Sequence, residues 1–114
     1  MQVRYLEIVT NEVDGVCATY ERLYGVTFGA GDASLGNART APLPGGGQLG
    51  VRAPMHETET PVVRPYVLVD DIEAAAQAAA EAGAEIAHPP MEIPGRGTFA
   101  IFIQGGIHHG LWQD

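Results

Sequence analysis

The sequence predicts an α+β fold in which two βαβββ modules form a curved, cup-shaped mixed sheet with both helices outside. The chain of 114 residues has the length of a single domain. Its apolar content of 46% and charged content of 18% are those of a globular protein with a packed core. The same order of segments, one strand, one helix and three further strands, can be followed twice along the chain. We therefore expect a single domain over residues 1–114.

Module one is expected over residues 1–54, and it begins with a strand and a helix. Residues 3–10 are rich in aromatic and β-branched side chains, which is typical of a strand. From Asn11 or Glu12, either of which could cap a helix, apolar residues recur at helical spacing until Gly25. This pattern predicts the first helix.

The rest of module one is expected to hold three short strands. Residues 26–28 are predicted to be a strand and residues 29–37 a loop. The segments on either side of glycines 45–47 then predict a hairpin with a glycine turn. Residues 55–61 are polar, acidic and bounded by prolines, and we expect them to be the linker.

Module two is expected over residues 62–114 and repeats the order. Residues 64–69 predict a strand, and the Ala-rich segment 70–83 predicts a helix that Asp70 or Asp71 caps and Gly83 ends. A short strand over 84–90 and a loop or broken strand over 91–97 should follow. A second hairpin is expected to turn at Gly105 and Gly106. Gly45, Gly46 and Gly50 align with Gly105, Gly106 and Gly110 at an offset of 60, which supports an internal repeat.

Alternation along the strands predicts which residues line the cup. Successive side chains of a strand face opposite sides of the sheet. Those expected to face the helices include Leu6, Ile8, Val67, Val69, Ile107 and Leu111. Those expected on the inner wall are Tyr5, Glu7, Gln48, Gly50, Arg52, Arg64, Tyr66, His108, Gly110 and Trp112. We expect the two glycines to leave space in this wall. Such a polar and aromatic wall is typical of a small-molecule pocket.

Composition excludes several classes of function. The chain has six arginines and no lysine, which excludes a Schiff-base or phosphate-loop lysine. The single cysteine, Cys17, excludes an internal disulfide, and we expect it to be buried on the helix. The net charge of −8 disfavours nucleic acid and anionic membranes as partners. Without a long apolar run or a signal-peptide pattern, we expect a soluble, cytoplasmic protein.

Three segments resemble the vicinal oxygen chelate superfamily, the group of glyoxalases, bleomycin resistance proteins and extradiol dioxygenases. Residues 6–29 are similar to the opening of its first module, and residues 64–86 to the first strand and helix of its second module. Residues 99–113, which end in Gly-Leu-Trp-Gln, are similar to its last hairpin. The resemblance implies the paired βαβββ fold and, commonly, a homodimer.

The resemblance also identifies the points at which metal-using members carry His, Glu or Gln. Matched residue by residue, these points are Tyr5, Gly50, Arg64 and Gly110. An arginine repels a cation, and glycine has no side chain to donate. With a shift of two residues Glu7 and His108 could be ligands, but catalytic sites usually hold three. We therefore expect no metal and no cofactor.

Glu7 and Arg64 are the first candidates for a site. The pair could replace the metal and bind an anionic or polar ligand at the floor of the cup, or it could be a structural ion pair. His108 is a candidate ligand or general base, whereas its neighbour His109 should lie on the helix side or under a dimer contact, as a buried imidazole.

Further candidates each have a structural interpretation. Tyr66 and Trp112 could stack on a planar ligand or fill the core, and Gln48 joins them on the inner wall. Arg39 and Arg52 could reach the mouth of the cup and bind an anion. His56, His88, Glu57 and Glu59 are expected to be solvated.

Three functions remain open from the sequence. The first is a metal-free small-molecule binding protein of the bleomycin-resistance type, with Tyr5, Glu7, Gln48, Arg52, Arg64, Tyr66, His108 and Trp112 as ligand-binding residues. The second is an isomerase, lyase or dioxygenase with Glu7 and His108 as catalytic candidates. The third is a dimeric module that binds no ligand, since sheet edges favour self-pairing.

Overall fold

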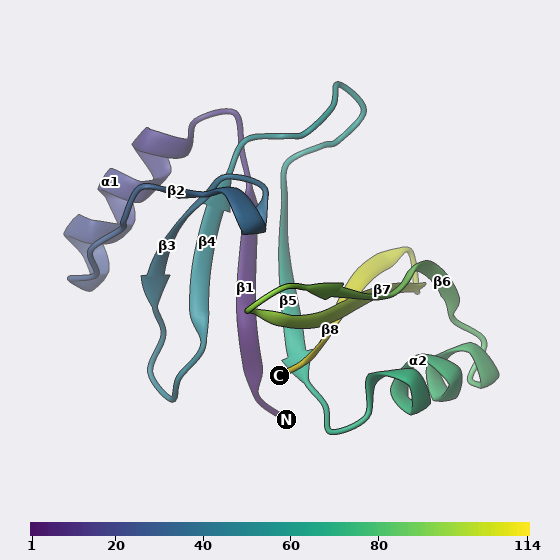
Figure 1. Ribbon diagram of the computed structural model, residues 1–114. Helices are drawn as coiled ribbons and strands as arrows, with labels where there is room; N and C mark the ends of the chain where they lie inside the picture. Colours follow the sequence, from purple (N-terminus) through teal and green to yellow (C-terminus); the bar gives the residue numbers. More distant parts are fainter. The chain divides into compact units, whose positions relative to one another are not determined.

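The computed structural model describes all residues from Met1 to Asp114 and confirms the α+β class with two βαβββ modules (Figure 1). The chain divides into two compact units. One unit, Tyr5–Val63, contains module one from Tyr5 onward together with the segment expected as a linker. The other combines Met1–Arg4 with Arg64–Asp114 and contains module two. Each unit has its own helix and its own core.

Module one is a four-stranded sheet with a helix on one face. Its elements are β1 (Val3–Val9), α1 (Val13–Tyr24), β2 (Gly31–Asp32), a short 3₁₀ helix (Ala33–Leu35), β3 (Ala38–Pro42) and β4 (Gln48–Arg52). The strand order is β2-β3-β4-β1, with β1 and β4 parallel and the other pairs antiparallel. The predicted hairpin is therefore confirmed, and Gly45 and Gly46 adopt the positive φ that its turn requires.

The strand predicted at 26–28 is absent, and the loop predicted at 29–37 contains β2 and the 3₁₀ helix. Phe28 is buried in the core, and its backbone N–H donates to the Glu21 carboxylate at 2.9 Å. A side chain of α1 thus satisfies this backbone group in place of a neighbouring strand. The apolar character of Val26 and Phe28 serves packing against the core cluster and not strand pairing.

The start of α1 also differs from the prediction. Glu12 occupies the N-cap position, but its side chain makes no capping hydrogen bond. The Thr10 hydroxyl instead accepts a hydrogen bond from the Glu12 N–H at 3.1 Å. The predicted end is confirmed, because Gly25 adopts a left-handed conformation and its N–H donates to Glu21 O.

The core of module one lies between α1 and one face of the sheet. Ile8, Leu49 and Val51 pack there with Cys17, which is fully buried as expected. Burial raises the pKa of the Cys17 thiol, so the thiol is a packing group. Because side chains alternate, Tyr5, Glu7, Gln48, Gly50 and Arg52 lie on the opposite face. We call this surface the helix-free face of module one.

Module two repeats this arrangement. Its elements are β5 (Val62–Leu68), α2 (Ile72–Glu81), β6 (Glu85–Ile93), β7 (Gly97–Gln104) and β8 (Ile107–Gln113). The strand order is β5-β8-β7-β6, with β5 and β8 parallel and the others antiparallel. The second predicted hairpin is confirmed, and Gly105 and Gly106 have positive φ at its turn.

One strand of module two is longer than predicted. The sequence predicts a strand that ends near Pro90, yet β6 continues to Ile93. Its pairing with β7 shifts register on both sides of His88. A proline cannot donate to a ladder, but it fits the unpaired side of an edge strand. Since β6 is the last strand in its module, the two prolines are compatible with it.

The helix α2 is capped as the sequence predicts. The Asp71 carboxylate accepts a hydrogen bond from the Ala74 N–H at 3.1 Å. The side chain of Gln113, the last residue of β8, accepts from the Ile72 N–H at 2.8 Å and so joins the last strand to the helix start. Past the other end, Gly83 has a φ of 98°.

The core of module two packs α2 against one face of its sheet. Ile72 and Ala76 meet Ala100 and Leu111 there. His109 lies on this helix side, as predicted, with its ring stacked on Phe102 at 4.8 Å. Its imidazole is only half-buried, however, and Ile107, which was expected to face the helix, is 60% exposed. Both lie close to the hairpin turn at Gly105 and Gly106.

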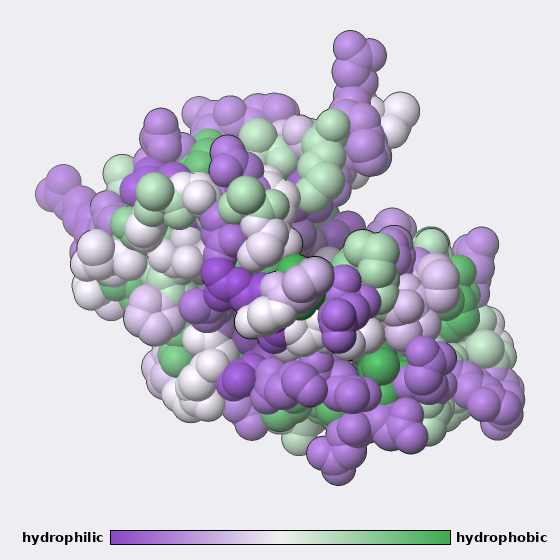
Figure 2. Space-filling view, viewed as in Figure 1, coloured by the Kyte–Doolittle hydropathy of each residue, from purple (hydrophilic) through white to green (hydrophobic).

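Hydrophilic and hydrophobic residues alternate over small areas of the surface in view (Figure 2). Neither helix has the length and apolar character that crossing a bilayer requires.

Candidate functional site

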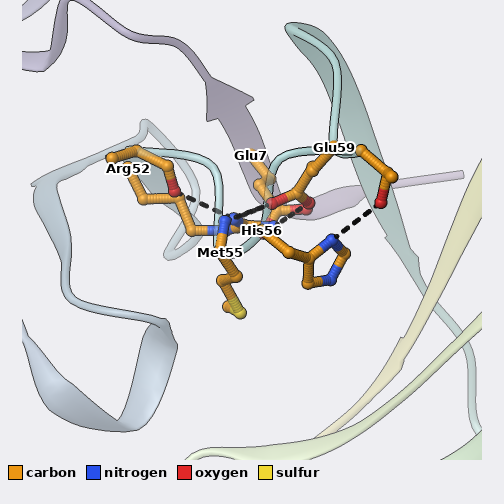
Figure 3. Close-up of polar contacts among 7 residues, drawn as sticks. Glu7, Arg52, Met55, His56 and Glu59 are labelled. Carbon is orange, nitrogen blue, oxygen red and sulfur yellow. Dashed lines mark hydrogen bonds and ion pairs between the residues drawn. The ribbon is translucent and has the colours of Figure 1, made fainter.

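The helix-free face of module one holds a buried charged network around Arg52 (Figure 3). Arg52 and Glu7, on β4 and β1, are each more than nine-tenths buried. Buried charges are rare in proteins and need partners, because removing a charged group from water costs on the order of several kcal/mol. The network is therefore the most conspicuous polar feature of this module.

Arg52 makes four hydrogen bonds through its guanidinium. Its Nε donates to Glu7 at 2.9 Å, and its Nη1 donates to the Ala53 carbonyl oxygen at 3.1 Å. Nη1 and Nη2 each donate a hydrogen bond to one carboxylate oxygen of Glu59, at 2.8 and 2.7 Å. This is the bidentate geometry in which arginine binds carboxylates most strongly. Arg52 thus joins β1, β4 and the segment expected as a linker.

The sequence analysis was wrong about Glu59. We expected a solvated residue in an acidic linker, but its side chain is only 16% exposed. Besides Arg52, it accepts a hydrogen bond from the Met55 N–H at 2.7 Å. The neighbouring Glu57 is exposed, as predicted. Nothing in the local sequence separates these two glutamates, since the partner of Glu59 lies seven residues earlier on a strand.

The pKa values of this network shift because of these contacts. The hydrogen bonds from Arg52 are the main cause that lowers the pKa of Glu59 to about 2. The hydrogen bonds to Glu59, followed by those to Glu7, raise the pKa of Arg52 above its ordinary value. Both groups are therefore charged throughout the physiological pH range. In this structure the molecule's own carboxylates, Glu7 and Glu59, occupy the Arg52 guanidinium.

A glycine makes room for the Arg52 side chain. Gly36 ends the 3₁₀ helix with a φ of 66°, a conformation that favours glycine. A Cβ at this position would overlap the end of the Met55 side chain and approach Arg52 Cδ at 3.0 Å. The 3₁₀ helix and the linker segment therefore enclose Arg52 from two sides.

Tyrosine rings cover the two glycines expected to leave space in the cup wall. A Cβ on Gly50 would overlap the hydroxyl end of Tyr5, and a Cβ on Gly110 would overlap the ring of Tyr66. The interpretation of these glycines as empty space is therefore wrong. They are instead the positions that allow a tyrosine to lie flat against the neighbouring strand.

The helix-free face of module two is aromatic. Tyr66 is 5% and Trp112 6% exposed, and their rings form an edge-to-face pair at 6.2 Å. Phe99 on β7 forms a second such pair with Tyr66 at 6.2 Å. These geometries are the favoured ones for aromatic rings. Arg64 lies two residues before Tyr66 on β5, on the same face by alternation, and is also buried.

The remaining predicted residues have varied positions. Gln48 lies opposite Tyr5 in the ladder and is half-buried. His108, a candidate ligand or base, is exposed beside the turn of the last hairpin. Arg39 pairs with Asp14 at 2.9 Å and also donates to Gly29 O.

The two other histidines have separate surroundings. His56 is exposed, as expected, and its ring lies 3.3 Å from the Thr58 hydroxyl. His88 was expected to be solvated, but it is half-buried on β6, with its ring 4.6 Å from that of Phe99.

The residues at the family's metal positions do not fit a divalent ion. Gly50 and Gly110 are covered by tyrosines, and the Glu7 carboxylate is held by Arg52 at 2.9 Å. A fixed guanidinium beside a carboxylate repels a metal ion and takes the oxygen that would bind it. No group of three or more His, Cys, Asp or Glu side chains is placed to hold a metal.

Comparison with known proteins supports the resemblance found in the sequence. No family model matches the chain. It is 32% identical over 117 aligned positions to a protein of Mycobacterium tuberculosis described as "Putative glyoxylase CFP32", and equally so to its Mycobacterium bovis counterpart. The alignment covers 89% of this chain but only 40% of those proteins. The chain therefore spans about two-fifths of the length of the curated relatives it matches.

Solved structures extend the comparison to the fold. Methylmalonyl-CoA epimerase from Mycobacterium tuberculosis matches with a TM-score of 0.74 at 15% identity, over 97% of this chain and 86% of that one. A Streptomyces coelicolor methylmalonyl-CoA epimerase variant, in complex with 2-nitronate-propionyl-CoA, matches with a TM-score of 0.72 at 14% identity. That alignment covers 100% of this chain and 97% of the epimerase.

The two-module architecture and these comparisons together define the fold. The chain has the vicinal oxygen chelate, or glyoxalase-type, fold, as the sequence resemblance implied.

Proposed function

We propose that the protein binds a small molecule on the helix-free faces of its modules and does so without a metal ion. The observation that carries this proposal is the location of the buried charges. The buried charged residues Glu7, Arg52 and Arg64 all lie on helix-free faces, where the sequence predicts the ligand-binding wall. A face built only for packing would be apolar, because buried ion pairs add little stability over hydrophobic residues.

Each face, taken by itself, combines charged or polar side chains with aromatic ones, which supports a ligand with both polar and aromatic parts. Module one offers Tyr5, Glu7, Gln48 and Arg52, and module two offers Arg64, Tyr66, His108 and Trp112. Small-molecule sites commonly combine aromatic walls with a few fixed polar groups. A structural neighbour is described in complex with a coenzyme A derivative, which supports the proposal that this fold holds small molecules.

Metal independence rests on the chemistry of the donors. The covered glycines and the Glu7–Arg52 pair leave module one without a complete ligand set. Sequestration of a compound, in the manner of bleomycin resistance proteins, requires no such set. We also propose that the protein acts in the cytoplasm and as a homodimer, both of which rest on the sequence arguments given above.

Thermal denaturation with a panel of planar drugs and metabolites tests the binding proposal. A bound ligand raises the melting temperature, because it stabilises only the folded state. We expect at least one compound to do so, and we expect Arg52→Gln or Trp112→Leu to reduce its effect. If no compound raises the melting temperature of the intact protein, the binding proposal is wrong.

Metal analysis separates binding from metal-dependent catalysis. We expect the purified protein to contain no stoichiometric transition metal and Ni²⁺, Zn²⁺ or Fe²⁺ to leave its melting temperature unchanged. Stoichiometric metal that is lost in Glu7→Gln or His108→Asn would instead favour an isomerase, lyase or dioxygenase.

A further inference from the structure

The contact between Glu59 and Arg52 resembles a carboxylate ligand in its binding site. Both oxygens of the Glu59 carboxylate accept from one edge of the guanidinium, at 2.8 and 2.7 Å. Planar, bidentate recognition of this kind is the reason arginine is used to bind carboxylates. The carboxylate here, however, belongs to the chain itself.

Arg52 does not depend on Glu59 for its position. The Nε atom is held by Glu7 at 2.9 Å and Nη1 by the Ala53 carbonyl at 3.1 Å. The stem of the side chain lies against Gly36, where no Cβ interferes. These contacts hold the Nε and Nη1 atoms independently of the Glu59 carboxylate. The guanidinium edge is therefore preorganised for a carboxylate.

The segment that carries Glu59 is suited to move. Residues 53–61 lie between β4 and β5 and contain no helix or strand. Ala53, Glu57 and Thr58 are exposed, and Met55 is 60% exposed. Within this segment, Glu59 is the side chain that joins it to the buried arginine (Figure 3). Few buried apolar groups fix such a segment, so its opening costs less than the opening of a core strand.

We propose that Glu59 is an internal substitute for a ligand carboxylate, and that a carboxylate-bearing small molecule replaces it on the Nη1–Nη2 edge of Arg52. This inference rests on the proposed small-molecule function and names the ligand class of the same face. Replacement releases Glu59 from Arg52, while the Ala53 carbonyl keeps its contact with Nη1, and so couples binding to a movement of the part of this segment around Glu59.

Glu59 competes with the ligand at high effective concentration. A tethered group has the advantage of an intramolecular contact, equivalent to a concentration on the order of millimolar for short flexible links. A small carboxylate alone therefore binds the intact protein weakly. The natural ligand displaces Glu59 because it makes additional contacts on the helix-free face. The Glu59–Arg52 pair therefore selects against small anions that make no such contacts.

Neutralising the two linker glutamates separately tests the proposal. Glu59→Gln removes the competing carboxylate, and Glu57→Gln is the matched control, since it changes the net charge equally but lies on an exposed residue of the same segment. The probe is sodium benzoate, titrated at constant ionic strength by NMR of the Arg52 Nε–H and by calorimetry. Sodium phosphate is the second probe.

We expect Glu59→Gln to bind benzoate at least about tenfold more tightly than the wild type and Glu57→Gln. The Arg52 Nε–H signal should shift during the titration, and adding Arg52→Gln to Glu59→Gln should abolish binding. Equal benzoate affinity in all three proteins would overturn the proposal, as would binding that persists without Arg52. Preference for phosphate over benzoate would overturn the carboxylate assignment.

Failure of this inference can be told from failure of the proposed function. If panel compounds raise the melting temperature but Glu59→Gln gains no affinity for benzoate, the function stands and the carboxylate exchange is wrong. If Glu59→Gln binds benzoate but no panel compound stabilises the wild type, the exchange stands and the broader function is wrong. Circular dichroism of each variant confirms that it is folded.

Discussion

The two modules share a fold but differ in how their helix-free faces are filled. Glu7 in module one is equivalent in the repeat to Tyr66 in module two. Arg52 is likewise equivalent to Trp112. Module one therefore has an ion-pair network where module two has edge-to-face aromatic rings. The comparison teaches that the backbone pattern fixes which positions face inward, whereas the chemistry of those positions is free to diverge.

The two modules also fill the same gap with tyrosines from different positions. In module two, Tyr66 lies directly opposite Gly110 in the ladder. In module one, Glu7 lies opposite Gly50, and the tyrosine that covers this glycine is Tyr5, two residues earlier. In both modules a tyrosine covers a glycine backbone. The position of that tyrosine in the strand differs between the two modules.

Loss of Arg52 should have the largest effect on stability. Arg52→Met leaves two carboxylates at a buried site without their shared cation, which we expect to cost about 3–5 kcal/mol of unfolding free energy. Urea unfolding measures this change. Arg39→Met is the control from the same module, because the Arg39–Asp14 pair is far more exposed, and it should cost less than about 1 kcal/mol. Equal losses in the two variants would show that the buried network around Arg52 contributes no more to stability than the exposed Arg39–Asp14 pair.

Alanine at the two covered glycines sharpens the comparison of tyrosines. Gly110→Ala meets the inner ring atoms of Tyr66 and the Pro65 carbonyl, so we expect a loss of about 2–3 kcal/mol. Gly50→Ala meets the outer end of the Tyr5 ring, which can move more easily, and should cost about 1–2 kcal/mol.

A helical glycine is the reference for these two changes. A Cβ on Gly15 in α1 would make only an ordinary contact, with Glu12 Cβ at 3.9 Å, and Gly15→Ala should raise stability by about 0.5–1 kcal/mol. Thermal and urea unfolding of all three variants measure the order. A smaller loss at Gly110 than at Gly50 would contradict the described packing.

The Glu59 contact predicts a defined pH dependence. The pKa of Glu59 falls from 4.5 to about 2 on folding. A lowered folded pKa contributes stability that is fully present above about pH 4.5 and is lost as the pH falls through about 2. Glu59→Gln should therefore cost on the order of 2 kcal/mol at neutral pH, and its difference from the wild type should shrink between these pH values. A difference that is independent of pH, or an equal one for Glu57→Gln, would refute this interpretation.

The helix starts provide the smallest contrast. Asp71 caps α2 through a hydrogen bond to the Ala74 N–H, whereas Glu12 makes no such bond in α1. Asp71→Ala should cost about 1 kcal/mol, and Glu12→Ala less than about 0.5 kcal/mol. Guanidinium unfolding of the two variants measures the difference, and a larger loss at Glu12 would show that the caps are assigned to the wrong helix.

Strand parity and helical spacing were enough to predict the two-module fold and the inward face. Cys17, Leu49 and Leu111 lie on the helix sides, as periodicity requires. Local signals failed where a tertiary partner decides the structure. Phe28 satisfies its backbone through Glu21 and needs no strand.

The candidate site was predicted less completely than the fold. Periodicity placed Glu7 and Arg52 on one face, but it could not show that they pair with each other. Glu59 lies in a polar segment without periodicity, so its contact with Arg52 has no signal in the sequence. Which residues cover the glycines depends on side-chain direction, and alternation alone does not give this direction.

NMR during a ligand titration tests the central claim, that the helix-free faces bind a small molecule. The Arg52 Nε–H reports on module one, the Trp112 indole N–H on module two, and the Cys17 amide on the helix side. With the most stabilising panel compound, we expect the Arg52 or Trp112 signal to shift in a saturable way while the Cys17 amide stays fixed. Saturable shifts confined to the helix side, with Arg52 and Trp112 unchanged, would contradict the claim.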